Sequence, residues 1–260
     1  MRASAREGGP VRFAARVEYD GTDFAGYQAQ PGRRTVQGEL EAALTRLSGE
    51  GRVRVDAAGR TDAGVHATGQ VIAFSLSRGM PVRELAVALD ALLPADVTVH
   101  AVRRVAVGFN PRYAARYREY RYTVWNGPRS PLSERTALGV REPLDVTAMA
   151  EAAQALVGRH DFSGFGGGHR QPIRTVYAIR IRRQGRTMTI DVVGDAFLRQ
   201  MVRSIVAALL RVGRGAATTE EVAAALESPG RAFAGAVAPP QGLCLRRVVL
   251  GRPANDEERR

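Results

Sequence analysis

The part of the sequence richest in chemically useful side chains is a short stretch between two apolar runs. Gly59-Arg-Thr-Asp-Ala-Gly-Val-His66 places a guanidinium, a hydroxyl, a carboxylate and an imidazole among glycines, which allow backbone to approach a ligand closely. Asp62 is the candidate for nucleophilic or base chemistry. The competing interpretation is a tight turn in which Asp62 only accepts hydrogen bonds from nearby amides. Spacing alone favours the turn.

The charge of the chain predicts a polyanionic partner. Of its 260 residues, 38 are lysine or arginine and 26 are acidic, so the formal net charge is +12, and all the basic residues of the first group are arginine. A guanidinium binds phosphate with two hydrogen bonds and stacks on bases, which suits RNA. A genome biased in base composition would also explain the missing lysine, but it would not explain the excess of positive charge.

The same composition argues against several other classes of protein. Apolar residues make up 45% and charged residues 25%, the balance of a globular protein. A single cysteine, Cys244, cannot form an internal disulfide, and no signal peptide is evident, so we expect a cytoplasmic protein. No apolar run approaches the roughly 20 residues that cross a bilayer. With four histidines and one cysteine we expect no zinc site.

The elements that must position Asp62 follow from the spacing of apolar residues. Alternation predicts a strand over 11–19, and Thr35 is a suitable N-cap for the helix that follows it. Short strands over 52–57 and 70–76 flank the glycine-rich stretch, and a helix over 81–93 and a strand over 97–107 come next. The order βαββαβ is that of a ferredoxin-like unit, in which two helices cover one face of an antiparallel sheet.

The second half of the chain repeats this plan. We expect strands over 115–125, 175–182, 187–193 and 242–250, with helices over 146–157, 197–212 and 218–227. The predicted fold class is therefore α+β, with two ferredoxin-like subdomains over 11–110 and 111–250 between flexible tails over 1–10 and 251–260. Their antiparallel sheets would join into one extended sheet, whose uncovered face would form a broad basic cleft.

The sequence predicts loops in two segments of the second half. Residues 126–144 are rich in proline, serine and charged residues and lack a period, which predicts an exposed loop. Gly164-Phe-Gly-Gly-Gly-His169 is either a mobile loop or a phosphate-binding one. It lacks the lysine and the strand-to-helix context of a P-loop, which favours the mobile loop.

Six segments, in order, resemble the tRNA pseudouridine synthases of the TruA type. Gly59-Arg-Thr-Asp-Ala-Gly-Val-His-Ala67 is similar to the signature loop of that family, and Gly69-Gln-Val71 follows as expected. The other matching segments are residues 19–28, Arg118-Glu-Tyr-Arg-Tyr122 with Asn126, His160-Asp-Phe-Ser163, Met201-Val-Arg203 and Gly242-Leu-Cys-Leu245. The resemblance covers roughly residues 11 to 250.

This resemblance implies an isomerase that converts uridine to pseudouridine in the anticodon stem-loop of tRNA, at positions 38, 39 and 40. It implies a homodimer and no cofactor or metal. Asp62 would be the nucleophile, or at least the carboxylate that starts glycosidic cleavage, since the reaction breaks the N1–C1′ bond and rejoins the uracil through C5 without redox change. Whether Asp62 attacks C1′, adds to the base or removes a ribose proton stays open. His66 is expected to hold the loop and not to act as a base.

Four other residues take roles from the same resemblance. Tyr120 would stack on the flipped uracil and assist proton transfer, and Arg203 would pair with Asp62. Arg60 would contact the RNA backbone and fill the space left by the flipped nucleotide, while Leu245 would pack against the uracil. From the residues alone, Tyr120 would be an aromatic of the core and Arg203 a solvated arginine on the outer face of a helix.

Two other classes of protein remain compatible with parts of the sequence. A catalytically silent RNA-binding protein or chaperone would keep the two sheets and the basic cleft, but it would not need Asp62, Tyr120 and Arg203 together. A metal-dependent nuclease would gather several carboxylates around its ion, whereas the glycine-rich stretch offers only Asp62.

Overall fold

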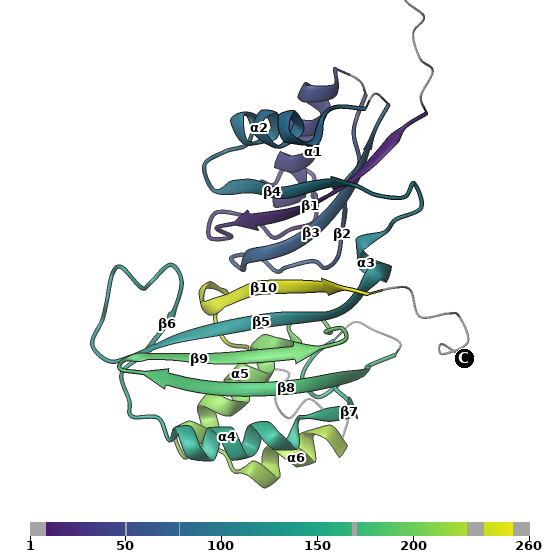
Figure 1. Ribbon diagram of the computed structural model, residues 1–260. Coiled ribbons are helices and arrows are strands. Elements are labelled where there is room, and N and C mark those ends of the chain that lie inside the picture. Colours follow the sequence, from purple (N-terminus) through teal and green to yellow (C-terminus); the bar gives the residue numbers. More distant parts are fainter. Residues whose placement is uncertain (1–8, 50, 78, 168–170, 228–236, 252–260) are drawn as a thin grey trace, which may run out of the picture.

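The computed structural model describes residues 9–49, 51–77, 79–167, 171–227 and 237–251 (Figure 1). Nearly all of the two predicted tails, and the end of the glycine cluster that follows Ser163, lie outside these residues.

The N-terminal half has the predicted βαββαβ order. Its elements are β1 (Val11–Tyr19), α1 (Val36–Ser48), β2 (Asp56–Ala57), β3 (His66–Leu76), α2 (Val82–Leu92) and β4 (Val97–Arg104). Thr35 caps α1 as expected, because its side chain accepts a hydrogen bond from the amide of Gly38, and the left-handed Gly49 ends the helix. The strands lie in the order β4-β1-β3, and β2 pairs with β3, which is the ferredoxin-like arrangement.

The C-terminal half repeats this arrangement with additions. Its elements are α3 (Pro111–Ala114), β5 (Ala115–Asn126), β6 (Leu138–Val140), α4 (Val146–Ala155), β7 (Gly158–Asp161), β8 (Ile173–Gln184), β9 (Thr187–Gly194), α5 (Met201–Gly213), α6 (Thr219–Glu227), η1 (Pro240–Gly242) and β10 (Leu243–Leu250). The order β10-β5-β9-β8 matches that of the first half, and β7 extends the edge beyond β8. The short β6, inside the predicted loop over 126–144, was not expected.

The two sheets join along β3 and β10 into one ten-stranded sheet, as predicted (Figure 1). The contact is a short parallel ladder in which Cys244 lies beside His66 and Leu245 beside Ala67. β2 pairs only with the far end of β3, at Ile72 and Ala73. The strand predicted over 52–57 is therefore reduced to two residues, and β10 takes the near end of the same edge.

One face of this sheet is buried in both halves. In β1 the exposed Arg16 and Glu18 alternate with buried residues, so Tyr19 points to the covered face. Residues paired across strands point the same way, and Tyr19, Ala67, Leu245, Tyr120 and Val192 form one continuous row across five strands. The covered faces of the two halves are therefore one face, and this row crosses the junction between them.

Candidate active site

Asp62 lies in the loop between β2 and β3, which we call the Asp62 loop (residues 58–65). The loop leaves the sheet between the part of β3 that pairs with β2 and the part that pairs with β10. It therefore lies over the junction of the two halves. The prediction that the glycine-rich stretch joins two strands is confirmed.

The first loop of the chain, residues 20–34, and the end of β1 hold the Asp62 loop from one side. The amide of Tyr27 donates to the carbonyl of Thr61 at 3.0 Å, and the hydroxyl groups of Tyr19 and Thr61 lie 2.8 Å apart. Gly26 has a φ of +106°, and a Cβ there would lie 3.1 Å from the carbonyl oxygen of Thr61. A glycine at this position therefore allows the close approach of the two backbones.

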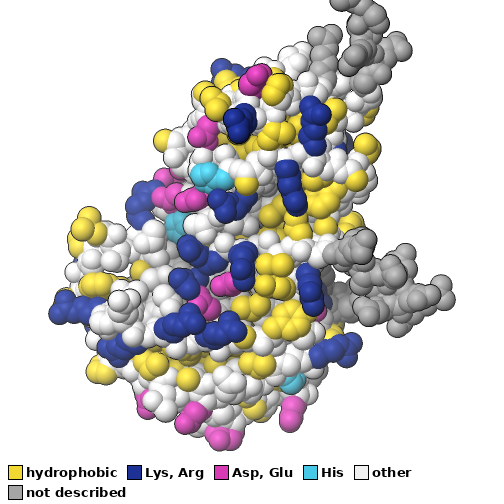
Figure 2. Space-filling view, viewed as in Figure 1, with side chains coloured by type: hydrophobic (Ala, Val, Ile, Leu, Met, Phe, Trp, Pro, Cys, Tyr) yellow, Lys and Arg dark blue, Asp and Glu magenta, His cyan; other side chains and the backbone are white. Residues whose placement is uncertain are grey.

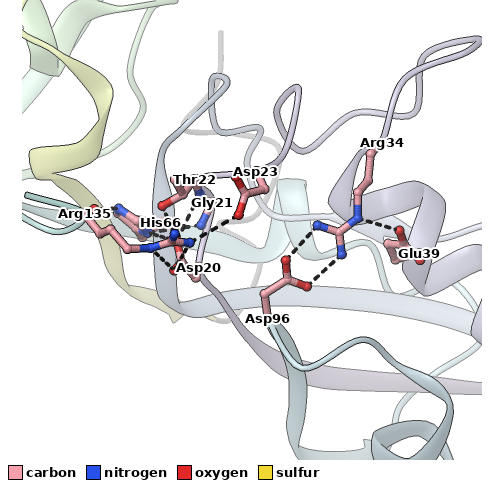
Figure 3. A network of polar contacts seen from close by, with 9 residues as sticks. All are labelled: Asp20, Gly21, Thr22, Asp23, Arg34, Glu39, His66, Asp96 and Arg135. Atoms are coloured by element: carbon pink, nitrogen blue, oxygen red, sulfur yellow. Dashed lines mark hydrogen bonds and ion pairs between the residues drawn. The ribbon is translucent and has the colours of Figure 1, made fainter.

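His66, the residue that follows the Asp62 loop, contacts the first loop of the chain and the C-terminal half (Figure 3). Its ring is 8% exposed, and its Nδ1 accepts the amide proton of Gly21 at 3.1 Å. Nε2 lies 2.9 Å from the carbonyl oxygen of Arg135 and 3.1 Å from that of Gln241, so it carries a proton, and Nδ1 also lies 3.1 Å from Oδ1 of Asp20. The guanidinium of Arg135 in turn pairs with Asp20 at 3.1 Å. These contacts join the two halves and agree with a holding role for His66.

A second arginine fixes the far end of the first loop (Figure 3). Arg34 makes a two-pronged ion pair with Asp96, at 2.7 and 2.8 Å, and a further one with Glu39 at 3.0 Å. Its guanidinium also lies over the ring of Phe24, 4.1 Å from the centroid. The carbonyl of Phe24 accepts a hydrogen bond from the amide of Gly64, so the contacts of Arg34 support the Asp62 loop as well.

Asp62 and Arg203 face each other. Nη1 of Arg203 lies 3.4 Å from Oδ2 of Asp62, and their side chains are 13% and 32% exposed respectively. Nε of Arg203 donates to the carbonyl of Ala238 at 2.7 Å, which aims the guanidinium at the Asp62 loop. The interpretation of Arg203 as a solvated arginine on the outer face of a helix is wrong, and the expected pairing with Asp62 is present. A half-exposed carboxylate beside a fixed cation is suited to nucleophilic or base chemistry.

Tyr120 lies next to this pair on the covered face. Its side chain is 7% exposed, and its ring packs edge-on against Phe197 with centroids 5.3 Å apart. Burial raises the pKa of Tyr120 to about 12, an effect that the charge of Arg118 opposes and that of Asp62 increases. The phenol is therefore protonated at neutral pH and can donate a proton or a hydrogen bond.

The two remaining predicted residues differ in their surroundings. Leu245 is fully buried in the central row, paired with Ala67 on one side and Tyr120 on the other. Arg60 is exposed on the Asp62 loop, and no hydrogen bond or ion pair to another described residue engages its guanidinium. The structure therefore brings Asp62, Arg203, Tyr120 and Leu245 together. Arg60 lies in the same loop as Asp62, with its side chain exposed to solvent.

The candidate catalytic groups do not lie on the uncovered face of the sheet, where the sequence predicted a basic cleft. The row that contains Tyr120 points to the covered face, and α5, which carries Arg203, packs on that face too. Figure 2 shows arginine side chains spread over one face of the molecule with acidic side chains among them. The site lies on the covered face, where Arg203 of α5 meets the Asp62 loop beside the buried central row.

Sequence reasoning missed two buried polar residues of the site. Gln70 is fully buried and donates from its amide to the carbonyl of Gly59 at 2.8 Å. Arg118 is 8% exposed and donates to the carbonyl of Ala58. The sequence could have indicated Arg118, because residues two apart in a strand point to the same face and Arg118 lies two residues before Tyr120.

Two further properties concern the described part of the chain. No three of its histidine, cysteine, aspartate or glutamate side chains gather in a way that could hold a metal ion. None of its helices combines the length and the apolar character needed to span a bilayer.

Comparisons with known proteins identify one family. A sequence profile of the tRNA pseudouridine synthase family matches residues 15–114 and 152–249. The tRNA pseudouridine synthase A of Geobacter sulfurreducens is 48% identical over 236 residues, which cover 89% of this chain and 96% of that protein. The proteins of the same name from Thermosipho melanesiensis and Halalkalibacterium halodurans are 46% and 44% identical, over 92% and 91% of this chain and 99% and 91% of their own lengths.

Proposed function

The chain belongs to the family of tRNA pseudouridine synthases, isomerases that act on tRNA, and we propose that Asp62 is the carboxylate that starts its reaction. The observation that carries this proposal is the pairing of Asp62 with Arg203 beside Tyr120. The loop that presents Asp62 is held by the first loop of the chain, by His66 and by Gln70. A carboxylate fixed in this way has little freedom to lose when it reacts.

The reaction itself needs no co-reactant. It breaks the bond between N1 and C1′, forms a bond between C5 and C1′, and exchanges the proton on C5 for one on N1, so substrate and product are isomers. Asp62 acts at the ribose or at the base, and all three routes left open by the sequence use its negative charge. Arg203 pairs with the carboxylate and aims it. Tyr120 stacks on the uracil, and its protonated phenol assists proton transfer near C5.

The remaining roles concern RNA. We assign Arg60 to the RNA backbone and to the space vacated by the flipped nucleotide, which its exposure and its free guanidinium support. Leu245 forms the floor under the uracil. The substrate region we propose is the anticodon stem-loop, at positions 38, 39 and 40, with binding supported by the net charge of +12 and by the exposed Arg60 beside Asp62.

Two further proposals rest on the family resemblance. The active form is a homodimer that binds one tRNA across both subunits, which light scattering of the purified protein would test. The enzyme works in the cytoplasm, where its tRNA substrate is made.

The proposed reaction can be tested with tRNA that carries tritium at C5 of uracil. Isomerisation releases this tritium to water, so release should be catalytic, and mapping of pseudouridine in the product should place it at positions 38, 39 and 40. Release from other positions would refute the assigned region. Binding without any release would indicate a catalytically silent RNA-binding protein, and chain cleavage would indicate a nuclease.

A further inference from the structure

Arg118 has an unusual set of partners for a buried cation. All four of its hydrogen bonds go to backbone carbonyl oxygens. Nε and Nη2 donate to Ala58 at 3.2 and 2.6 Å, Nη1 donates to Asp195 at 2.6 Å, and Nη2 donates to Arg112 at 3.3 Å. None of the ion pairs among the described residues involves Arg118. Burial lowers its pKa, but a guanidinium keeps its charge at neutral pH.

Two of these three carbonyls, those of Ala58 and Asp195, belong to the segments that build the site. Ala58 begins the Asp62 loop and lies four residues before Asp62 itself. Asp195 begins the link from β9 to α5, which contains Phe197 and leads to Arg203. Arg118 therefore connects the two segments that supply the Asp62–Arg203 pair, and it does so from the strand that carries Tyr120.

The shape of the guanidinium explains why these contacts require arginine. Burial of a cation is costly, and here backbone carbonyl dipoles, together with the nearby charge of Asp195, offset that cost. An ammonium group is compact and sits at the end of a flexible stem, so lysine cannot reach three separate carbonyls in a fixed plane. A neutral amide has too few donors for the same purpose.

We propose that Arg118 is a positioning residue for the isomerisation: its guanidinium sets the spacing between the Asp62 loop and the segment that leads to Arg203. It acts through these segments and does not contact the uridine. This inference rests on the proposed role of Asp62. A displacement of about 1 Å at reacting groups can lower a rate by about 100-fold, so the effect of losing this connection should be large.

The test compares Arg118→Ala and Arg118→Lys with a matched control, Arg121→Ala. Arg121 lies on the same strand but points to the other face, where it pairs with Asp191 at 2.6 Å. Single-turnover tritium release gives the rate and filter binding gives the Kd for tRNA. We expect Arg118→Ala to lower the rate by about 100-fold with the Kd within about threefold of the wild type. Added guanidinium ion should restore part of the rate, Arg118→Lys should stay slow, and Arg121→Ala should keep its rate.

The results that would overturn the proposal are distinct from failure of the proposed function. A wild-type rate in folded Arg118→Ala would refute it, and so would a slow rate that guanidinium does not raise or a Kd that weakens as much as the rate falls. If the alanine variant does not fold, Arg118→Lys decides the matter, because a normal rate in that variant refutes the need for a planar guanidinium at this position. Failure of the proposed function would instead show as no tritium release by the wild type, or as full activity without the Asp62 carboxylate.

Discussion

The buried tyrosines predict how the protein unfolds in alkali. Four of the seven tyrosines are buried, and burial raises the pKa of each: Tyr19, Tyr27, Tyr120 and Tyr122. An unfolded chain exposes all of them, and an ordinary phenol ionises near pH 10. Below that pH both states keep their protons, so stability is unaffected. Above it, the unfolded state loses four protons that the folded state retains, and stability falls as the pH rises.

The size of this effect follows from proton linkage. Each tyrosine contributes about 1.4 kcal/mol per pH unit, so four together contribute about 5.5 kcal/mol per pH unit until the folded groups ionise. For Tyr120 that limit is a pKa of about 12. A domain with a total stability of about 5 to 15 kcal/mol should therefore unfold cooperatively within about one to three pH units above pH 10.

The assay is a tyrosinate titration near 295 nm, followed together with far-ultraviolet circular dichroism. We expect at most three phenols to ionise before the chain unfolds, and the rest to ionise with the loss of secondary structure. Tyr122→Phe should reduce the pH dependence of the unfolding free energy by about a quarter, because it removes one of the four groups. Reversible ionisation of all seven phenols near pH 10 with an unchanged circular dichroism spectrum would refute the reasoning.

Three other predictions concern the site. Affinity for tRNA should fall at least about tenfold between 50 and 200 mM salt, because bound arginines release condensed counterions, and a flat dependence in filter binding would contradict arginine-based RNA binding. EDTA should leave tritium release from an anticodon stem-loop RNA unchanged, since no described cluster of side chains could hold a metal ion; a loss that added metal restores would overturn the mechanism. His66→Phe should lower kcat and destabilise the fold by about 1 to 3 kcal/mol in urea, because two part-buried carbonyls lose the donor that they share. His66→Gln should recover part of both effects, and equal effects of the two substitutions would argue against the assigned contacts.

Much of the fold could be predicted because local signals were strong. The alternation in β1, the Thr35 cap and the apolar stripe of α5 gave elements whose bounds the structure reproduces within a few residues. The position of the Asp62 loop between two strands was also predictable, whereas spacing alone favoured a plain turn there and the role of Asp62 came from the family resemblance. The short β6 was not, because three residues inside a polar loop carry no period.

The face of the sheet that holds the site could not be predicted from local patterns. It depends on the register between β10 and its neighbours, which aligns Leu245 with both Ala67 and Tyr120. These strands are far apart in sequence, and a shift by one residue would turn the row to the other face. The role of Arg118 was hidden for a different reason: its partners are backbone carbonyls, and every residue has one, so the sequence carries no mark of them.

The central claim is that the negative charge of Asp62 starts the reaction, and Asp62→Asn tests it most directly. Asparagine keeps the size of the side chain and most of its hydrogen bonding but can act neither as a carboxylate nucleophile nor as a base. Because RNA affinity is spread over many phosphate contacts, we expect filter binding of tRNA to change little while tritium release falls to background. Retained turnover in the folded variant would contradict the account.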